Sequence, residues 1–255
     1  ALGGRPLTIR TLDVGGDKGV NYLTLPHAPN PALGWRGIRY WLDHPEQART
    51  QLRAILRVAA AYPVKVMFPM VSTLEEVWSA LTLVENARLE LRAAKLAHSE
   101  SVETGIMVET PAAALMAAQL ARQVAFFSIG ANDLTQYIMA ADRANPQIAA
   151  VVHPLLSSLQ GSFEALRSVQ QVVQAAYQAA TRVAFCGELA GDPRIAALLV
   201  GLGIDELSMN LPMVAGVKAA LRELTLPKAI GLAEGALALE TANQIEQFLL
   251  RQLPG

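Results

Sequence analysis

The chain has 255 residues, 52% of them hydrophobic and 17% charged, with a formal net charge of -1. This near-neutral balance gives no electrostatic reason to expect binding to nucleic acid, and the single cysteine excludes a disulfide framework or a multi-cysteine zinc site. No segment has the pattern of a signal peptide, and the apolar stretch 193–204 is too short to cross a bilayer. We therefore expect a cytoplasmic protein without membrane insertion.

Apolar, strand-like runs recur along the chain, and a helical pattern follows each of them. The predicted strands are residues 7–15, 65–70, 105–110, 125–133, 182–188 and 204–210, with 34–39 as a weaker candidate. Alternation of strands and helices indicates βαβ units and a parallel sheet. A TIM barrel, (β/α)8, needs eight strands in roughly 250 residues. We expect such an α/β barrel lacking its first strand unit in this chain, with an open doubly wound sheet as the alternative.

The helical segments carry recognisable start signals. Residues 45–61 place apolar side chains on one helix face, namely Leu52, Ile55, Leu56 and Ala59. Ser72 and Glu75 fit a capping box, and Thr110 and Asp192 each precede a proline suited to the first helical position. Each of these positions therefore predicts the beginning of a helix.

No linker rich in proline, glycine or serine divides the chain, so residues 1–255 are predicted to form one domain. From residue 225 onward the pattern is helical and carries no reactive groups. We expect this tail, 225–255, to pack on the outside of the barrel or on a partner.

Polar residues gather where the predicted strands end. In a parallel barrel the C-terminal ends of the strands form the functional face, and here they carry Asp13, Lys18, Glu109, Asn132, Asp133, Cys186 and Glu188. Glu109 and Asp133 are hard oxygen ligands from separate strand ends, and Mg²⁺ takes one or two carboxylates beside waters and substrate oxygens. A magnesium site is expected; the alternative is that Glu109 caps a local group and Asp133 is the N-cap of a helix.

Three arginines and the cysteine complete the candidate site. Guanidinium groups bind phosphate and carboxylate in a bidentate fork. Arg10 lies among apolar residues, where burial would require an anionic partner, and the glycines around Arg36 would let a ligand approach. Arg143 fits a surface ion pair as well as a ligand contact. Cys186 fits either a small buried hydrophobe or a thiol acid or nucleophile.

Six motifs carry a resemblance to a known family. They are RTLDVGGDK, LGWRGIR, IMVETPAAA, FFSIGANDLTQY, ADRAN and CGELAGD. In this order they resemble the C-terminal domain of phosphoenolpyruvate-protein phosphotransferase, enzyme I of the bacterial sugar phosphotransferase system. Pyruvate phosphate dikinase and phosphoenolpyruvate synthase share the NDLTQ element and a CG motif, but the LAGD that follows CGE is more similar to enzyme I.

The resemblance implies a barrel that binds phosphoenolpyruvate (PEP) and Mg²⁺ and passes the phosphoryl group to a histidine on a separate N-terminal domain, then to a small phosphocarrier protein. It implies that Glu109 and Asp133 hold Mg²⁺ and that Cys186 donates the proton that yields pyruvate. The substrate-binding residues it implies are Arg10, Arg36, Asn132 and Arg143, and with less weight Lys18. It also implies a homodimer formed through this domain.

The chain departs from the family pattern at several points. A phosphate-binding arginine in a Leu-Arg-Thr-Glu type segment of the first strand has no counterpart, and the phosphorylatable histidine and its domain are absent. Ala131 stands where threonine is usual, and Ala144 where glycine is usual. We therefore expect a fragment of a larger multidomain protein. The alternatives are a PEP-binding domain of the dikinase or synthase type and a non-catalytic module for PEP sensing or dimerisation.

Overall fold

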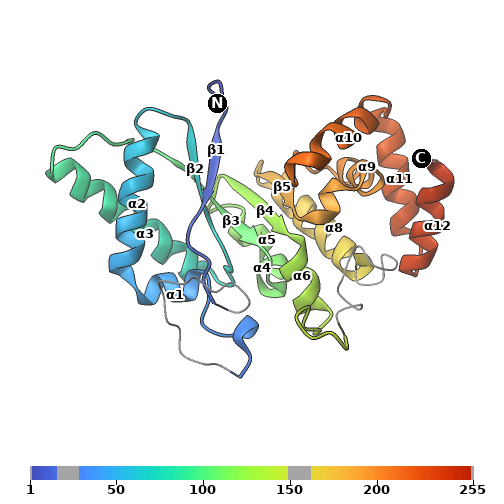
Figure 1. The fold of residues 1–255 in the computed structure, drawn as a ribbon, viewed down its shortest axis with the longest axis horizontal. Helices are drawn as coiled ribbons and strands as arrows, with labels where there is room; N and C mark the ends of the chain where they lie inside the picture. Colours follow the sequence, from blue (N-terminus) through green and yellow to red (C-terminus); the bar gives the residue numbers. More distant parts are fainter. Residues whose placement is uncertain (1, 16–28, 149–161, 254–255) are drawn as a thin grey trace.

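A computed structural model of the chain describes residues 2–15, 29–148 and 162–253 (Figure 1). Its strands form one six-stranded parallel sheet whose spatial order follows the chain order from β1 to β6. The strands are β1 (Leu7–Arg10), β2 (Val64–Phe68), β3 (Glu103–Val108), β4 (Phe126–Gly130), β5 (Arg182–Cys186) and β6 (Glu206–Ser208). All six lie within, or overlap, the runs predicted as strands.

Helices connect the strands and pack on the sheet (Figure 1). Those before β4 are α1 (Ile38–Asp43), α2 (Pro45–Ala59), α3 (Leu74–Ala93), α4 (Pro111–Leu115) and α5 (Ala117–Leu120). Those that follow are α6 (Ala131–Ile138), α8 (Ser162–Gln178), α9 (Pro193–Gly201), α10 (Leu211–Arg222), α11 (Leu226–Leu237) and α12 (Ala242–Gln252). Short 3₁₀ turns, η1 (Pro31–Leu33) and η2 (Glu188–Gly191), complete the connections.

The strand order distinguishes between the two predicted architectures. In a doubly wound sheet the order reverses at a switch point, whereas here each strand pairs with its neighbours in the chain. The fold is therefore a curled, singly wound sheet of the barrel type, and the doubly wound alternative was wrong. Within the described residues β1 and β6 are the two edges, so the sheet is an open half-barrel. No described helix is long and apolar enough to cross a membrane.

The two faces of the sheet differ in character because alternate side chains point to opposite sides. The face toward the helices is apolar and buried, and it includes Val66, Phe68, Ile106, Val108, Phe127, Ile129, Val183 and Phe185. The opposite face lines a hollow of about 430 Å³ and carries polar groups, among them Thr8, Arg10, Lys65, Ser128, Arg182 and Glu206. Polar and ionisable side chains thus collect on the side of the sheet that faces away from the helices.

Two local predictions were wrong. Residues 34–39 form no strand, because α1 begins at Ile38 after Gly37, whose φ of +57° is a left-handed conformation suited to glycine. The capping box of α3 is one residue later than predicted, at Thr73 and Glu76. Both Ser72 and Thr73 have a glutamate three positions on, but the chain is extended at Thr73, which becomes the N-cap. The caps at Thr110 and Asp192 are confirmed.

The tail from residue 225 forms α11 and α12. The first of these packs against α9, where the two helices approach so closely that a Cβ added to Gly201 would lie 1.9 Å from the carbonyl oxygen of Ala229. Ile245 and Leu249 of α12 are buried in the same apolar core. The tail therefore extends the helical layer beyond α9, away from the strand ends that carry the polar residues (Figure 1).

Candidate functional site

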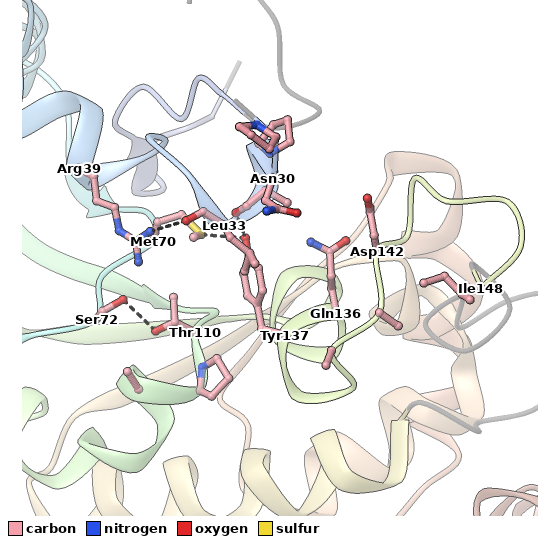
Figure 2. A pocket seen from close by; sticks show the side chains of 17 residues that line it. Asn30, Leu33, Arg39, Met70, Ser72, Thr110, Gln136, Tyr137, Asp142 and Ile148 are labelled. Carbon is pink, nitrogen blue, oxygen red and sulfur yellow. Dashed lines mark hydrogen bonds between the residues drawn. The ribbon is translucent and has the colours of Figure 1, made fainter. Parts of the chain in front are cut away.

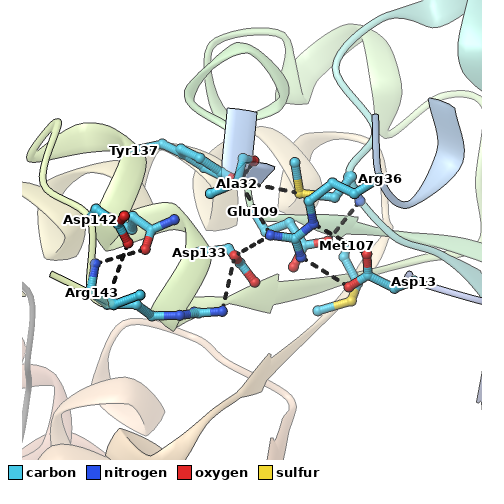
Figure 3. A network of polar contacts seen from close by, with 12 residues as sticks. Asp13, Ala32, Arg36, Met107, Glu109, Asp133, Tyr137, Asp142 and Arg143 are labelled. Atoms are coloured by element: carbon cyan, nitrogen blue, oxygen red, sulfur yellow. Dashed lines mark hydrogen bonds and ion pairs between the residues drawn. The ribbon is translucent and has the colours of Figure 1, made fainter. Parts of the chain in front are cut away.

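Three of the polar residues predicted at the strand ends, Asp13, Glu109 and Asp133, lie close together in Figure 3. Asp13 follows β1, Glu109 follows β3, Asp133 lies in the first turn of α6 after β4, and Cys186 ends β5. Because all strands are parallel, their C-terminal ends meet at the same edge. Figure 3 draws Glu109 and Asp133 in the same group of side chains, and a shared cation site would need both residues at this edge.

Arg36 is the centre of this network. Its side chain is fully buried, and its Nε and Nη2 atoms donate to Oδ1 and Oδ2 of Asp13 at 3.3 and 3.0 Å. Nη1 donates to Asp133 Oδ1 at 2.9 Å and to the hydroxyl of Tyr137 at 3.3 Å. Burial alone would lower the pKa of Arg36, but the two carboxylates outweigh it and hold this pKa above its ordinary value. In this arrangement the nitrogens of Arg36 all contact protein groups, and the residue fixes two carboxylates in place.

Two glycines allow the close approach around Arg36. Gly15 has a φ of +115°, and a Cβ there would lie 2.7 Å from the Cβ of Arg36. Gly37 has a φ of +57°, and a Cβ there would lie 2.6 Å from Met70 and 3.3 Å from Asp13 Oδ1. A larger residue at either position would both strain the backbone and displace the buried ion pair.

Arg10 and Arg143 approach the same carboxylates from more open positions. Nη1 of Arg10 lies 3.2 Å from Asp13 Oδ2, and 39% of its side chain is exposed. Nη2 of Arg143 lies 3.5 Å from Asp133 Oδ1, and 22% of its side chain is exposed. The premise that Arg10 is buried was wrong, because it points into the hollow rather than into the apolar core, but it does have an anionic partner. Both guanidinium groups can be reached from solvent.

Glu109 and Asn132 supply further oxygen atoms. Glu109 is fully buried, and its Oε1 accepts from the backbone N–H of Met70 at 2.7 Å. Gly130 lets β4 pass close by, because a Cβ there would lie 2.8 Å from Glu109 Oε2. The Oδ1 atom of Asn132 is buried and has no hydrogen-bond partner among the described residues. A buried carbonyl oxygen without a donor is costly, so this atom fits a ligand position better than a structural one.

Asp133 is held by α6 rather than serving as its cap. The N-cap of this helix is Gly130, so the predicted alternative of an N-cap role for Asp133 was wrong. One turn later Tyr137 lies on the same helix face, and its hydroxyl donates to the carbonyl oxygen of Ala32 at 2.5 Å. Tyr137 was not predicted to belong to the site. Its spacing of four residues from Asp133 was the available signal, since such residues share a helix face.

Cys186 lies at the end of β5 beside the network. Its thiol donates to the carbonyl oxygen of Ile129 at 3.3 Å. Burial raises the pKa of Cys186 above its ordinary value, although a hydrogen bond with Ser128 acts in the opposite direction. The thiol is therefore protonated at neutral pH. Lys18, the remaining predicted contact, lies outside the described residues.

The donor set fits a hard cation with few protein ligands. No cluster of three or more histidine, cysteine, aspartate or glutamate side chains suitable for a metal occurs in the part of the chain that the structure describes. Glu109 and Asp133 provide two carboxylates, and Asn132 provides a neutral oxygen. Mg²⁺ keeps several waters or substrate oxygens when it binds proteins, so such a sparse set suits Mg²⁺ better than a structural zinc ion.

A second cavity, of about 560 Å³, adjoins the network (Figure 2). It extends between η1 and the C-terminal part of α6 and is lined mostly by apolar atoms, with Arg39, Gln136 and Asp142 among its polar groups. Met70 and Tyr137 form the wall that it shares with the Arg36 network. None of the carboxylates that surround Arg36 lines this cavity.

Comparison with known proteins gives a consistent family. Residues 1–226 match the family model "PEP-utilising enzyme, PEP-binding domain". The chain is 48% identical over 245 residues to the multiphosphoryl transfer protein of Rhodobacter capsulatus, covering 96% of this chain and 28% of that protein. It is 43% identical over 249 residues to the phosphoenolpyruvate-protein phosphotransferase of Haemophilus influenzae, covering 98% of this chain and 42% of that protein. The chain thus spans less than half the length of these relatives.

Solved structures support the fold alone. A citrate lyase of Burkholderia xenovorans aligns with 83% of this chain and 69% of its own, with a TM-score of 0.52 and 20% sequence identity. The family assignment comes instead from the sequence matches, which cover nearly the whole chain. The chain belongs to the PEP-binding domain family of the PEP-utilising enzymes.

Proposed function

We propose that this chain is the PEP- and Mg²⁺-binding part of a PEP-protein phosphotransferase. The longer protein would transfer the phosphoryl group of PEP to a histidine on a separate domain, release pyruvate and pass phosphate to a small phosphocarrier protein of a sugar phosphotransferase system. The observation that carries the proposal is the network in which Arg36 joins Asp13 and Asp133 at the strand ends, beside Glu109. The names of the relatives agree with it.

The charges of the network fit an anionic substrate accompanied by a cation. Three carboxylates, of Asp13, Glu109 and Asp133, lie with the guanidinium groups of Arg10, Arg36 and Arg143. Bound to Glu109 and Asp133, Mg²⁺ would neutralise charge on the transferred phosphoryl group.

The remaining side chains have separable roles. Arg10 and Arg143 are partly exposed and would bind the phosphate and carboxylate groups of PEP. The side-chain NH2 group of Asn132 would donate to the phosphate beside Asp133, and its Oδ1 would face the cation. Arg36 would not contact PEP itself. Its contacts with two carboxylates would keep Asp133 oriented toward the cation.

Cys186 would supply the proton that completes the reaction. When the P–O bond breaks, the phosphoryl group goes to the histidine nitrogen and the enolate of pyruvate remains. The thiol is protonated at neutral pH, so Sγ would give its proton to the methylene carbon and later regain one from solvent. A buried thiol with a raised pKa is suited to this role as an acid rather than as a nucleophile.

The larger assembly is part of the same proposal. The edges of the described sheet at β1 and β6 would be joined by further strands, among them a first strand unit that precedes this chain, and these would complete the eight strands of a (β/α)8 barrel. A cytoplasmic homodimer would follow the family pattern. The competing function is a non-catalytic PEP sensor or dimerisation module.

Titration calorimetry of PEP into the full-length protein tests the proposal. Wild type should bind PEP in the presence of Mg²⁺ and form pyruvate. Glu109→Gln and Asp133→Asn should each remove the dependence on Mg²⁺. Glu223→Gln is the matched control, because it removes an exposed carboxylate at the C-terminal end of α10, which does not line the hollow. Binding of PEP without turnover would favour the sensor, and Mg²⁺ dependence that survives both variants would refute the metal assignment.

A further inference from the structure

Asp13 is the point at which two of the three arginines meet. Its Oδ2 atom lies 3.0 Å from Nη2 of Arg36 and 3.2 Å from Nη1 of Arg10, and its Oδ1 atom lies 3.3 Å from Nε of Arg36. The side chain of Asp13 is completely buried. One carboxylate therefore contacts a buried and a partly exposed guanidinium group at once, and Figure 3 shows its contact with the buried one, Arg36.

The surroundings of Asp13 are fixed by the backbone. It lies three residues after the end of β1, and Gly15 and Gly37 let the two segments that carry Asp13 and Arg36 come into contact. Asp13 Oδ1 would lie only 3.3 Å from a Cβ on Gly37. The carboxylate thus has little room to move, and the arginines that bind it are held accordingly.

Arg10 depends on this carboxylate more than Arg36 does. Arg36 also contacts Asp133 and Tyr137. Within the described residues, Arg10 has only Asp13 and a long contact with the sulfur of Met107, at 4.0 Å, to fix its guanidinium group. An arginine side chain loses much conformational freedom when it is held in one orientation, and a ligand binds more tightly where that freedom is already lost.

We propose that Asp13 is a positioning residue of the phosphotransfer site, and that it acts by holding Arg10 ready for the phosphate of PEP. The inference rests on the proposed function. Asp13 itself does not contact the substrate, since its oxygens face guanidinium groups of the protein. It extends the site beyond the residues that would contact PEP and the cation.

The test compares variants of the full-length protein by steady-state kinetics with PEP. Asp13→Asn should raise the KM for PEP by about 10- to 100-fold, because misplacement of a substrate-positioning group by ~1 Å has effects of this order. Arg10→Gln should raise it similarly. If Asp13 acts through Arg10, the double variant should match Arg10→Gln within about twofold, whereas independent effects multiply.

Thr241→Ala is the structural control. Thr241 Oγ1 accepts from the backbone N–H of Gln244 at 3.3 Å and caps α12, and it does not line the hollow. This variant should lower the melting temperature without changing the KM. If Asp13→Asn does not fold, Asp13→Glu takes its place, since it keeps the charge that pairs with Arg36 but shifts the carboxylate by one methylene. It should fold and still show the raised KM.

The outcomes separate the two proposals. A wild-type protein that neither binds nor converts PEP would overturn the proposed function, and the role of Asp13 with it. An active wild type would leave the proposed function in place while the role of Asp13 is judged from its variants. An unchanged KM in a folded Asp13 variant, or multiplicative effects in the double variant, would overturn the inference alone.

Discussion

Nη1 of Arg36 lies 2.9 Å from Oδ1 of Asp133, although the two residues are 97 positions apart in the chain. Both side chains are nearly or fully buried, with exposed fractions of 0% and 7%. Because Arg36 also binds Asp13, one guanidinium group connects the end of β1, the segment before α1 and the first turn of α6. The candidate site is therefore also a junction that stabilises the sheet edge.

Replacement of Arg36 by methionine should destabilise the fold strongly. The variant leaves Asp13 and Asp133 buried without this cation, and removal of one partner from a buried ion pair costs about 3–5 kcal/mol. Urea unfolding followed by circular dichroism measures the loss. Arg194→Met is the control. Arg194 pairs with Asp192, but 39% of the Arg194 side chain is exposed, so the expected loss of unfolding free energy is at most about 1 kcal/mol. Equal losses would show that the Arg36 network does not stabilise the fold.

The fold was largely predictable because parallel strands buried on one face are dominated by apolar residues. All six strands fall in predicted runs, but the runs extend too far at their C-terminal ends, as at 7–15 against Leu7–Arg10. The residues that follow the last paired position are still buried, now around the site, and Asp13 and Val14 show this. In a single sequence, a buried segment that does not pair with a strand gives the same apolar pattern as a strand.

The sequence predicted which types of residue form the candidate site, but it did not predict which of them contact one another. The carboxylates were found because strand ends meet at one edge of a parallel sheet. Arg36 was expected as a substrate ligand, yet it contacts Asp13, Asp133 and Tyr137 across separations of 23, 97 and 101 residues. No local pattern specifies pairs so distant in sequence. Whether the side chain of Arg10 points into the apolar core or into the hollow depends on which face of β1 it occupies.

Replacement of Tyr137 by phenylalanine should loosen the segment Pro31–Leu33. The hydroxyl donates to the carbonyl oxygen of Ala32 and accepts from Arg36, and burial raises the pKa of Tyr137, so the group stays neutral and able to donate. Loss of these bonds should cost about 1–2 kcal/mol. Hydrogen exchange read by mass spectrometry should quicken at η1.

The control for that experiment is Tyr177→Phe. Tyr177 lies on α8 with 85% of its surface exposed, so removal of its hydroxyl should change the unfolding free energy by less than about 0.5 kcal/mol. Unchanged exchange at η1 in Tyr137→Phe would mean that the hydroxyl does not anchor this turn.

The pH dependence of Cys186 alkylation distinguishes an acid from a nucleophile. Only the thiolate reacts with iodoacetamide, and burial raises the pKa of Cys186 above the ordinary value of about 8.5. At pH 7 to 8 the folded protein should therefore react more slowly than free cysteine, and the rate should rise only at higher pH. Peptide mass spectrometry identifies the modified residue.

Ser128→Ala sharpens this test. The hydrogen bond from Ser128 lowers the pKa of Cys186 and so opposes burial. Its removal should move the alkylation profile to still higher pH, and denatured protein should react like free cysteine. Reaction faster than free cysteine at neutral pH would indicate a stabilised thiolate, and Cys186 would then be no proton donor for the enolate.

Two glycines in the C-terminal helices should respond to alanine in opposite ways. A Cβ on Gly201 of α9 would lie 1.9 Å from the carbonyl oxygen of Ala229 and 2.5 Å from its carbon, so α11 must move away. A Cβ added to Gly231 of α11 would have no atom within 4 Å. Gly201→Ala should therefore lower the unfolding free energy by about 1–3 kcal/mol, as overpacking does. Gly231→Ala should raise the unfolding free energy by up to about 1 kcal/mol, because alanine has the higher helix propensity.

Thermal unfolding of both variants tests this contrast. A Gly201→Ala protein as stable as Gly231→Ala would show that α11 is not packed on α9 in solution.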